Sequence, residues 1–155
     1  MSETSLSIRD KVEICALAWL ASLKPTDAIW TPVEFKRRKE QTDRKFPRIV
    51  FDATRSPEDE KVEGLYRVEL SMYLGTMADE VVTGSTPQVA HTQRSGFLAE
   101  TFGYGNKEAF IAYCTANIPG IAVYDLFIEE EVSEQTERHW FDHLTYSVVC
   151  ALRDE

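Results

Sequence analysis

The last third of the chain alternates apolar and polar side chains with a period of two. From Trp140 onward, apolar residues fill every second position with a single interruption, at Asp142. Residues 121–128 and 66–74 alternate in the same way. A period of two with one apolar face is typical of strands half buried in an antiparallel sheet. Residues 47–53, which a proline opens, predict a further strand near an edge.

Three other segments have the spacing of helices. A capping box at Ser7 opens an amphipathic helix that ends before Pro25. Thr86 caps a second helix, over residues 86–103. A third follows over residues 106–118, with Asn106 as its expected cap.

The predicted order is therefore helix, strand, strand, helix, helix, strand, strand. Strands that come in pairs favour an α+β fold over a parallel sheet that alternates with helices. We expect an antiparallel sheet of about four strands with helices packed on one face, in a single domain over residues 1–155. Residues 26–45 show neither period and predict a long irregular loop, in which a short helix near residues 33–41 is an alternative.

Charge is distributed unevenly along this chain. Its net charge of −9 argues against nonspecific binding to DNA or to an anionic membrane. Residues 34–48, however, contain seven basic and three acidic side chains, whereas residues 129–137 contain five glutamates. We expect the acidic segment to be the solvated tip of a hairpin between the last two strands.

The two segments of opposite sign are candidates for a contact between subunits. The basic segment has two other interpretations, a solvated face and a contact to phosphate groups. A contact between two unlike surfaces is head-to-tail and closes into a ring when the rotation permits. The interface candidates are Lys36, Arg37, Arg38, Lys39, Arg44 and Lys45 on the basic side, and Glu129, Glu130, Glu131, Glu134 and Glu137 on the acidic side.

Candidate chemistry is sparse by comparison. His139 and His143 lie four residues apart on a predicted strand, which separates them by ~13 Å, too far to share a metal ion. The sequence contains no nucleophile elbow, P-loop or dinucleotide fingerprint. The three cysteines show no metal-ligand spacing and fall on apolar faces, which favours reduced, buried thiols. We therefore expect no catalytic residue, no cofactor and no metal.

Two further hypotheses belong to different functional classes. One is a small hydrolase-like enzyme with a site over the sheet, formed by His91, His143 and nearby carboxylates. The other is an apolar-ligand-binding module lined by Trp19, Trp30 and Trp140, which a deep cavity between the first helix and the sheet would favour. No apolar run approaches the ~20 residues of a membrane span, and the first residues show no secretion signal.

The order of elements over nearly the whole chain resembles the tail terminator (tail-completion) proteins of long-tailed bacteriophages and the related neck proteins. The resemblance rests on the helix that ends at Pro25, the strands at residues 47–51 and 66–74, the two helices within residues 86–118, and the closing hairpin. It implies an α+β subunit that forms a ring, usually of six copies, without catalytic residues.

In that family the ring caps the tail-tube protein and joins it to the head connector, while DNA passes through the central channel. The resemblance thus places the protein in the tail or neck of a virion, and in the host cytoplasm during assembly. It also implies that loops become ordered on assembly, here residues 26–45, 77–85 and 129–137.

Overall fold

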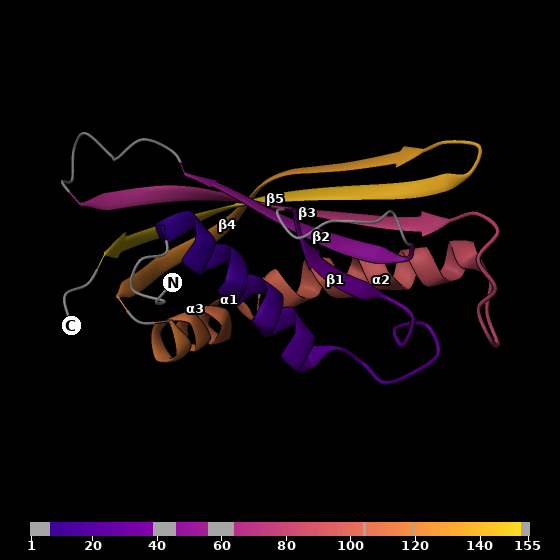
Figure 1. Cartoon of the computed structure of the whole chain (residues 1–155), viewed down its shortest axis with the longest axis horizontal. Coiled ribbons are helices and arrows are strands. Elements are labelled where there is room, and N and C mark those ends of the chain that lie inside the picture. Colours follow the sequence, from indigo (N-terminus) through magenta and orange to yellow (C-terminus); the bar gives the residue numbers. More distant parts are fainter. Residues whose placement is uncertain (1–6, 39–45, 56–63, 104, 119, 153–155) are drawn as a thin grey trace.

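The structure of the chain is a computed structural model that describes residues 7–38, 46–55, 64–103, 105–118 and 120–152. These residues form three helices and one five-stranded sheet, which confirms the predicted α+β class (Figure 1). The helices are α1 (Ile8–Leu23), α2 (Pro87–Phe102) and α3 (Lys107–Asn117). The strands are β1 (Glu34–Arg37), β2 (Arg48–Arg55), β3 (Leu65–Met77), β4 (Ile121–Gln135) and β5 (His139–Leu152).

The sheet has the strand order β1-β2-β3-β5-β4. β1 pairs with β2 in parallel, while the other three pairs are antiparallel, so the sheet is mixed. The expectation of about four strands, all antiparallel, was therefore wrong in these details. It missed β1, which lies inside the segment expected to be an irregular loop or a short helix. A strand of four residues is too short to show a period of two, and the pairing of Phe35 with Ile49 joins two separate segments.

The last hairpin is longer than its charge pattern predicted. β4 continues through the glutamates to Gln135, which pairs with Trp140, so only residues 136–138 turn between the strands. The expected tip over residues 129–137 is thus largely strand. Glutamate has a low strand propensity, but β5 supplies a full ladder of pairing partners, and the acidic side chains remain exposed.

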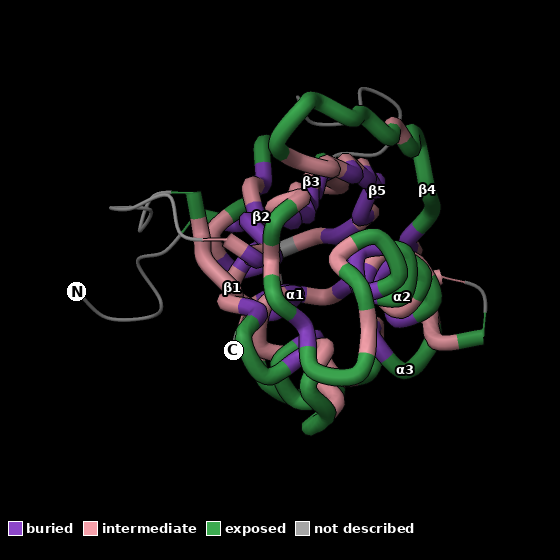
Figure 2. The backbone as a smooth tube through the Cα atoms, turned by 90° about the vertical axis from the view of Figure 1, so that its right-hand side faces the viewer, coloured by how far each residue is buried: buried purple, intermediate pink, exposed green. Residues whose placement is uncertain are grey.

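The three helices cover one face of the sheet (Figures 1 and 2). Val12, Ala16 and Leu20 of α1 are buried there in one apolar cluster with Phe51 and Leu70 of the sheet. Burial of such side chains stabilises the fold by about 1.5–3 kcal/mol each.

The three helices begin after the predicted cap residues, and two of these residues make a cap hydrogen bond with their side chain. The Oγ of Ser7 accepts a hydrogen bond from the N–H of Asp10 at 3.3 Å, and the Oγ1 of Thr86 accepts one from the N–H of Val89 at 3.3 Å. Asn106 occupies the predicted cap position of α3, but its side chain makes no cap hydrogen bond and instead donates to the carbonyl of Glu100.

The opposite face of the sheet carries none of the described helices, and we call it the open face (Figure 2). The register places Val50, Tyr73 and His143 on it, in one line across three strands. Most of its side chains are half buried or exposed, unlike those on the face that the helices cover.

Candidate assembly surface

The two oppositely charged segments lie at opposite edges of the same sheet. The strand order places β1, with the start of the basic segment, at one edge, and β4, with the glutamates, at the other. Within the described ranges, neither strand has a second pairing partner. An unpaired edge presents backbone N–H and C=O groups that can pair with another chain.

The acidic edge consists of the five predicted glutamates, which are all exposed. Glu129 accepts a hydrogen bond from the Oγ of Ser147 at 2.7 Å. Glu130 and Glu134 pair with Thr145 and Phe141, which places both on the open face. The remaining two are Glu131, on the helix-covered face, and Glu137, in the turn.

The charge of the acidic edge affects the pKa of a buried tyrosine, Tyr146. Glu131 pairs with Leu144 of β5, and Tyr146 lies two residues further along the same strand. Burial and the neighbouring charge of Glu131 raise the pKa of Tyr146 to about 12. Its hydroxyl group therefore remains a neutral hydrogen-bond donor, directed to the carbonyl of Ala99.

The basic edge divides into side chains with different roles. Lys36 pairs with Val50 and therefore points to the open face, where it is half exposed. The Arg38 side chain is 66% exposed, and its Nη1 lies 3.0 Å from the carboxylate of Asp52. Exposed ion pairs of this kind contribute little to stability. Lys39, Arg44 and Lys45 lie outside the described residues.

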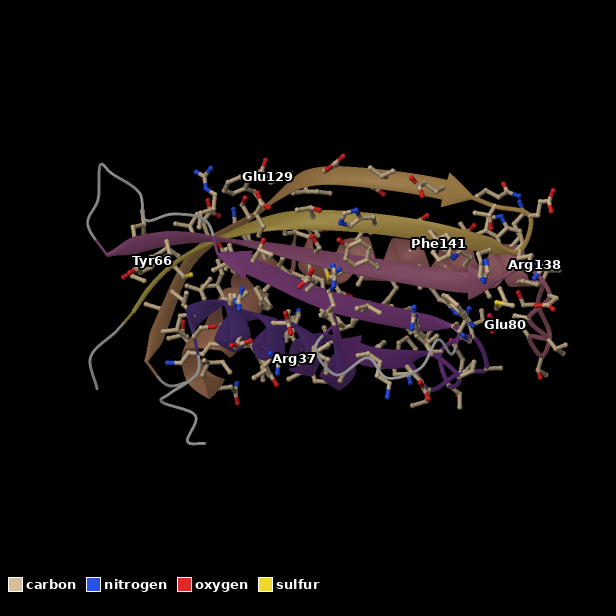
Figure 3. All side chains as sticks on the ribbon, turned by 45° about the horizontal axis from the view of Figure 1, so that its top comes forward. Arg37, Tyr66, Glu80, Glu129, Arg138 and Phe141 are labelled. Atoms are coloured by element: carbon tan, nitrogen blue, oxygen red, sulfur yellow. The ribbon has the colours of Figure 1, made fainter. Side chains whose placement is uncertain are left out.

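Arg37 points to the opposite face from Lys36 and is part of the fold. Its Nε donates to Glu13 at 2.5 Å, and its Nη2 donates to Asp10 at 2.8 Å, both on α1. Glu13 is only 2% exposed and also accepts a hydrogen bond from the N–H of Ala53 in β2 at 2.7 Å. Arg37 therefore ties α1 to β1 (Figure 3), and the structure does not offer it to a second subunit.

The two edges also share a level along the strands. Lys36 pairs with Val50, Val50 with Tyr73, Tyr73 with His143, and His143 with Val132. This row runs from the basic edge to the middle of the acidic one, and Glu130 and Glu134 flank its last member. Since the pairings make β1 antiparallel to β4, a second copy in the same orientation could lay its β1 along β4.

The first half of β4 exposes apolar side chains. Tyr124, Phe127 and Ile128 are 62%, 37% and 49% exposed. Beside them lies a groove of about 350 Å³. It is lined by Ala99, Gly103, Lys107, Leu126, Phe127, Ile128 and Tyr146. Neighbouring exposed apolar residues on an edge strand are typical of an interaction surface.

A separate group of polar side chains is buried between α2 and the sheet. Arg94 of α2 is fully buried, and both of its terminal nitrogens lie 2.8 Å from Glu80. His91, one turn earlier, lies 2.8 Å from Thr76 through Nδ1 and 3.2 Å from Asp142 through Nε2. The polar residue that interrupts the apolar pattern of β5 thus has its partners on α2.

Asp142 remains ionised in this buried position. Burial alone would raise its pKa, but hydrogen bonds from His91 and Ser95 outweigh that effect and hold the pKa below its ordinary value. Ser95 donates to Asp142 and not to His91, whose two nitrogens are already occupied. No imidazole nitrogen is therefore left to activate Ser95 as a nucleophile.

Neither the two histidines of the enzyme hypothesis nor the three tryptophans of the binding hypothesis converge. His91 lies on the helix-covered side of the sheet, whereas His143 points to the open face. Trp19 packs against Tyr113, Trp30 packs against Phe97, and neither lines a described cavity. Trp140 lines a cavity of about 410 Å³ between α2 and the hairpin, together with His91, Ser95 and Asp142.

Two further searches of the described residues bear on the class of site. No three His, Cys, Asp or Glu side chains among them gather as a metal site would require. None of the helices in the described ranges combines the length and apolar character needed to cross a bilayer.

No protein-family model matches this chain, and no curated protein matches it.

Proposed function

We propose that this protein is a structural subunit that forms a ring with copies of itself, as a tail terminator or neck component of a long-tailed bacteriophage. The observation that supports the proposal is the placement of opposite charges on the two edges of one sheet, at the same level along the strands. Such a subunit attracts the next copy at each edge, and this function requires no catalytic residue.

The geometry of the edges favours a head-to-tail contact. Because β1 runs antiparallel to β4, a second copy that keeps the orientation of the first can place its β1 along β4 in the ordinary antiparallel manner. Both open faces then lie on the same side. A repeated contact of this type closes into a ring when the rotation between copies permits, and the resemblance implies six copies.

The charge balance suits the role of a passage for DNA. With a net charge of −9, the subunit has little affinity for the phosphate backbone, so DNA can pass as cargo without being held. The partners in this proposal are the tail-tube protein on one side of the ring and the head connector on the other. The site of action is the virion neck, after assembly in the host cytoplasm, and the protein is not an enzyme.

Mass measurement of the purified protein, alone and mixed with tail-tube protein, tests the proposal. We expect a closed homo-oligomer that caps tubes. The double reversal Glu130→Lys and Glu134→Lys should weaken the oligomer, because both side chains lie on the acidic edge. The matched control is Glu69→Lys, an exposed glutamate of the inner strand β3, which should leave the mass unchanged. A strict monomer that never caps tubes would overturn the proposal.

A further inference from the structure

A cavity of about 340 Å³ opens on the open face near the acidic edge. It is lined by Tyr73, Val132, Glu134, Phe141, Asp142 and His143. The cavity thus has rings from β3 and β5 and the carboxylate of Glu134 from β4. The carboxylate of Asp142 is bound to His91 and Ser95 on the helix-covered side. Figure 3 shows Phe141 on this part of β5.

The rings of the cavity are held by stacking against aromatic neighbours. Tyr73 and His143 stack with their centroids 4.1 Å apart and their planes at 19°. Phe141 is stacked with His139 at 5.2 Å and 27°. His143 is also fixed from the other side, since its Nε2 lies 3.1 Å from the Oγ1 of Thr145.

This combination of groups suits a cation. Aromatic faces carry partial negative charge and attract ammonium and guanidinium groups, and a nearby carboxylate adds a direct ion pair. No lysine or arginine of the described part of the subunit lines the cavity. The nearby guanidinium of Arg48 lies over Phe46 instead, 4.7 Å from the ring centroid.

We infer that the cavity receives the ammonium group of Lys36 from the next copy in the ring. This inference rests on the proposed function and names the contact that would hold two copies together. Lys36 points to the open face from the basic edge, and a second copy that lays its β1 along β4 brings its Lys36 beside the cavity.

Lys36 fits this role better than its basic neighbours. Arg37 is bound to Asp10 and Glu13 on the opposite face. Arg38 follows the last residue of β1 and pairs with Asp52. The flexible stem of a lysine can carry its charge across the boundary between two sheets.

The position of Glu34 excludes one register, and the lining of the cavity selects Glu134 as the carboxylate partner. Glu34 lies two residues before Lys36 and points to the same face. If Lys36 of one copy stood opposite Val132, Glu34 would stand opposite Glu134, and the two like charges would repel. A shift that sets Lys36 opposite Glu134 moves Glu34 to Thr136, beyond the glutamates of β4. Glu134 also pairs with Phe141, so the ammonium group then lies in line with the ring.

A zero-length crosslink provides a direct test on the full chain. A carbodiimide joins a lysine amine to a carboxylate as an amide only when the two are in contact. Within one subunit, Lys36 and Glu134 lie four strand spacings apart, about 19 Å or more, so an amide between them must join two copies. We expect a crosslinked dimer whose peptides map to Lys36 and Glu134. The crosslink should disappear in Lys36→Arg and persist in Glu137→Gln.

The strength of association provides a second, independent readout. Glu134→Gln and Lys36→Met should each weaken association about tenfold, and the double variant should be no weaker than either single variant. Glu137→Gln serves as the matched control, and unchanged urea midpoints show that the variants are folded. Additive effects, or rings in which Lys36 crosslinks elsewhere or not at all, would overturn this inference alone. A wild-type protein that never associates would overturn both the inference and the proposed function.

Discussion

The two terminal nitrogens of Arg94 each lie 2.8 Å from a carboxylate oxygen of Glu80, although Arg94 is fully buried. The same side chain donates twice to the carbonyl of Ile29. A single arginine thus fixes two connections, residues 24–33 and 78–86, to α2. The resemblance implies that residues 77–85 become ordered on assembly, but Glu80 and the buried Val82 already anchor this loop in the single subunit.

Glu80→Ala should lower the free energy of unfolding by about 3–5 kcal/mol, because it leaves the buried guanidinium of Arg94 without its counter-charge. Urea unfolding at neutral pH measures the change. The matched control is Asp79→Ala, an exposed neighbour, which should change the free energy by less than about 0.5 kcal/mol. Equal effects of the two substitutions would contradict a structural role for the pair.

The pKa of Asp142 predicts how stability depends on pH. Because the pKa of this carboxylate is lower in the folded than in the unfolded state, its contribution is complete above the unfolded pKa, about 4. The contribution is lost as the pH falls through the lower folded value. The difference in unfolding free energy between wild type and Asp142→Asn should therefore be constant above about pH 5 and shrink below about pH 4. A difference that grows on acidification would show that the carboxylate is not stabilised in its charged form.

Lys36 and Arg37 should separate assembly from stability. Arg37→Met should lower the free energy of unfolding by about 3 kcal/mol, since Glu13 is buried and loses its cation. Lys36→Met should change it by less than about 0.5 kcal/mol and act on association instead. Urea titrations of the two variants, side by side, check this contrast. Because of the contacts of Arg37, reversal of all four charges at residues 36–39 should lower the stability of the fold as well as weaken association.

Two glycines should respond in opposite directions to alanine. A methyl group at Gly75 would lie 2.5 and 2.7 Å from ring carbons of Phe46, so Gly75→Ala should destabilise the protein by about 1–3 kcal/mol. A methyl group at Gly96, inside α2, meets open space, and Gly96→Ala should stabilise the protein by about 0.5–1 kcal/mol. Thermal or urea unfolding distinguishes the two, and a neutral Gly75→Ala would mean that Phe46 can move aside without cost.

The sequence predicted the elements that bury one face along a long segment. Residues 66–74 and 140–152 carry an unbroken or once-broken apolar alternation, and both are strands. The pattern missed β1, because this strand of four residues is defined by its parallel pairing with β2. Such a pairing leaves no period in the local sequence. It also misjudged where β4 ends, since a row of glutamates is compatible with a strand whose neighbour supplies the hydrogen bonds.

The candidate surface was predictable in charge but not in geometry. The two segments of opposite sign are visible in the sequence, whereas their placement at opposite edges follows from the strand order alone. The sequence also contained one signal for the buried network. Asp142 interrupts an apolar face, and a carboxylate in such a position needs partners, which α2 provides one helical turn apart as His91 and Ser95.

The unequal lengths of the two edge strands have a consequence for stoichiometry. β1 has four residues and β4 has fifteen, so one copy can shield only the distal end of its neighbour's long strand. The first half of β4, with Tyr124, Phe127 and Ile128, would remain an exposed strand edge on every subunit of a closed ring. A foreign polypeptide could add its own strand there by β-augmentation without displacing any copy. Self-assembly would then use the second half of β4 and recruitment of an unrelated protein the first half, so the two interactions need not compete.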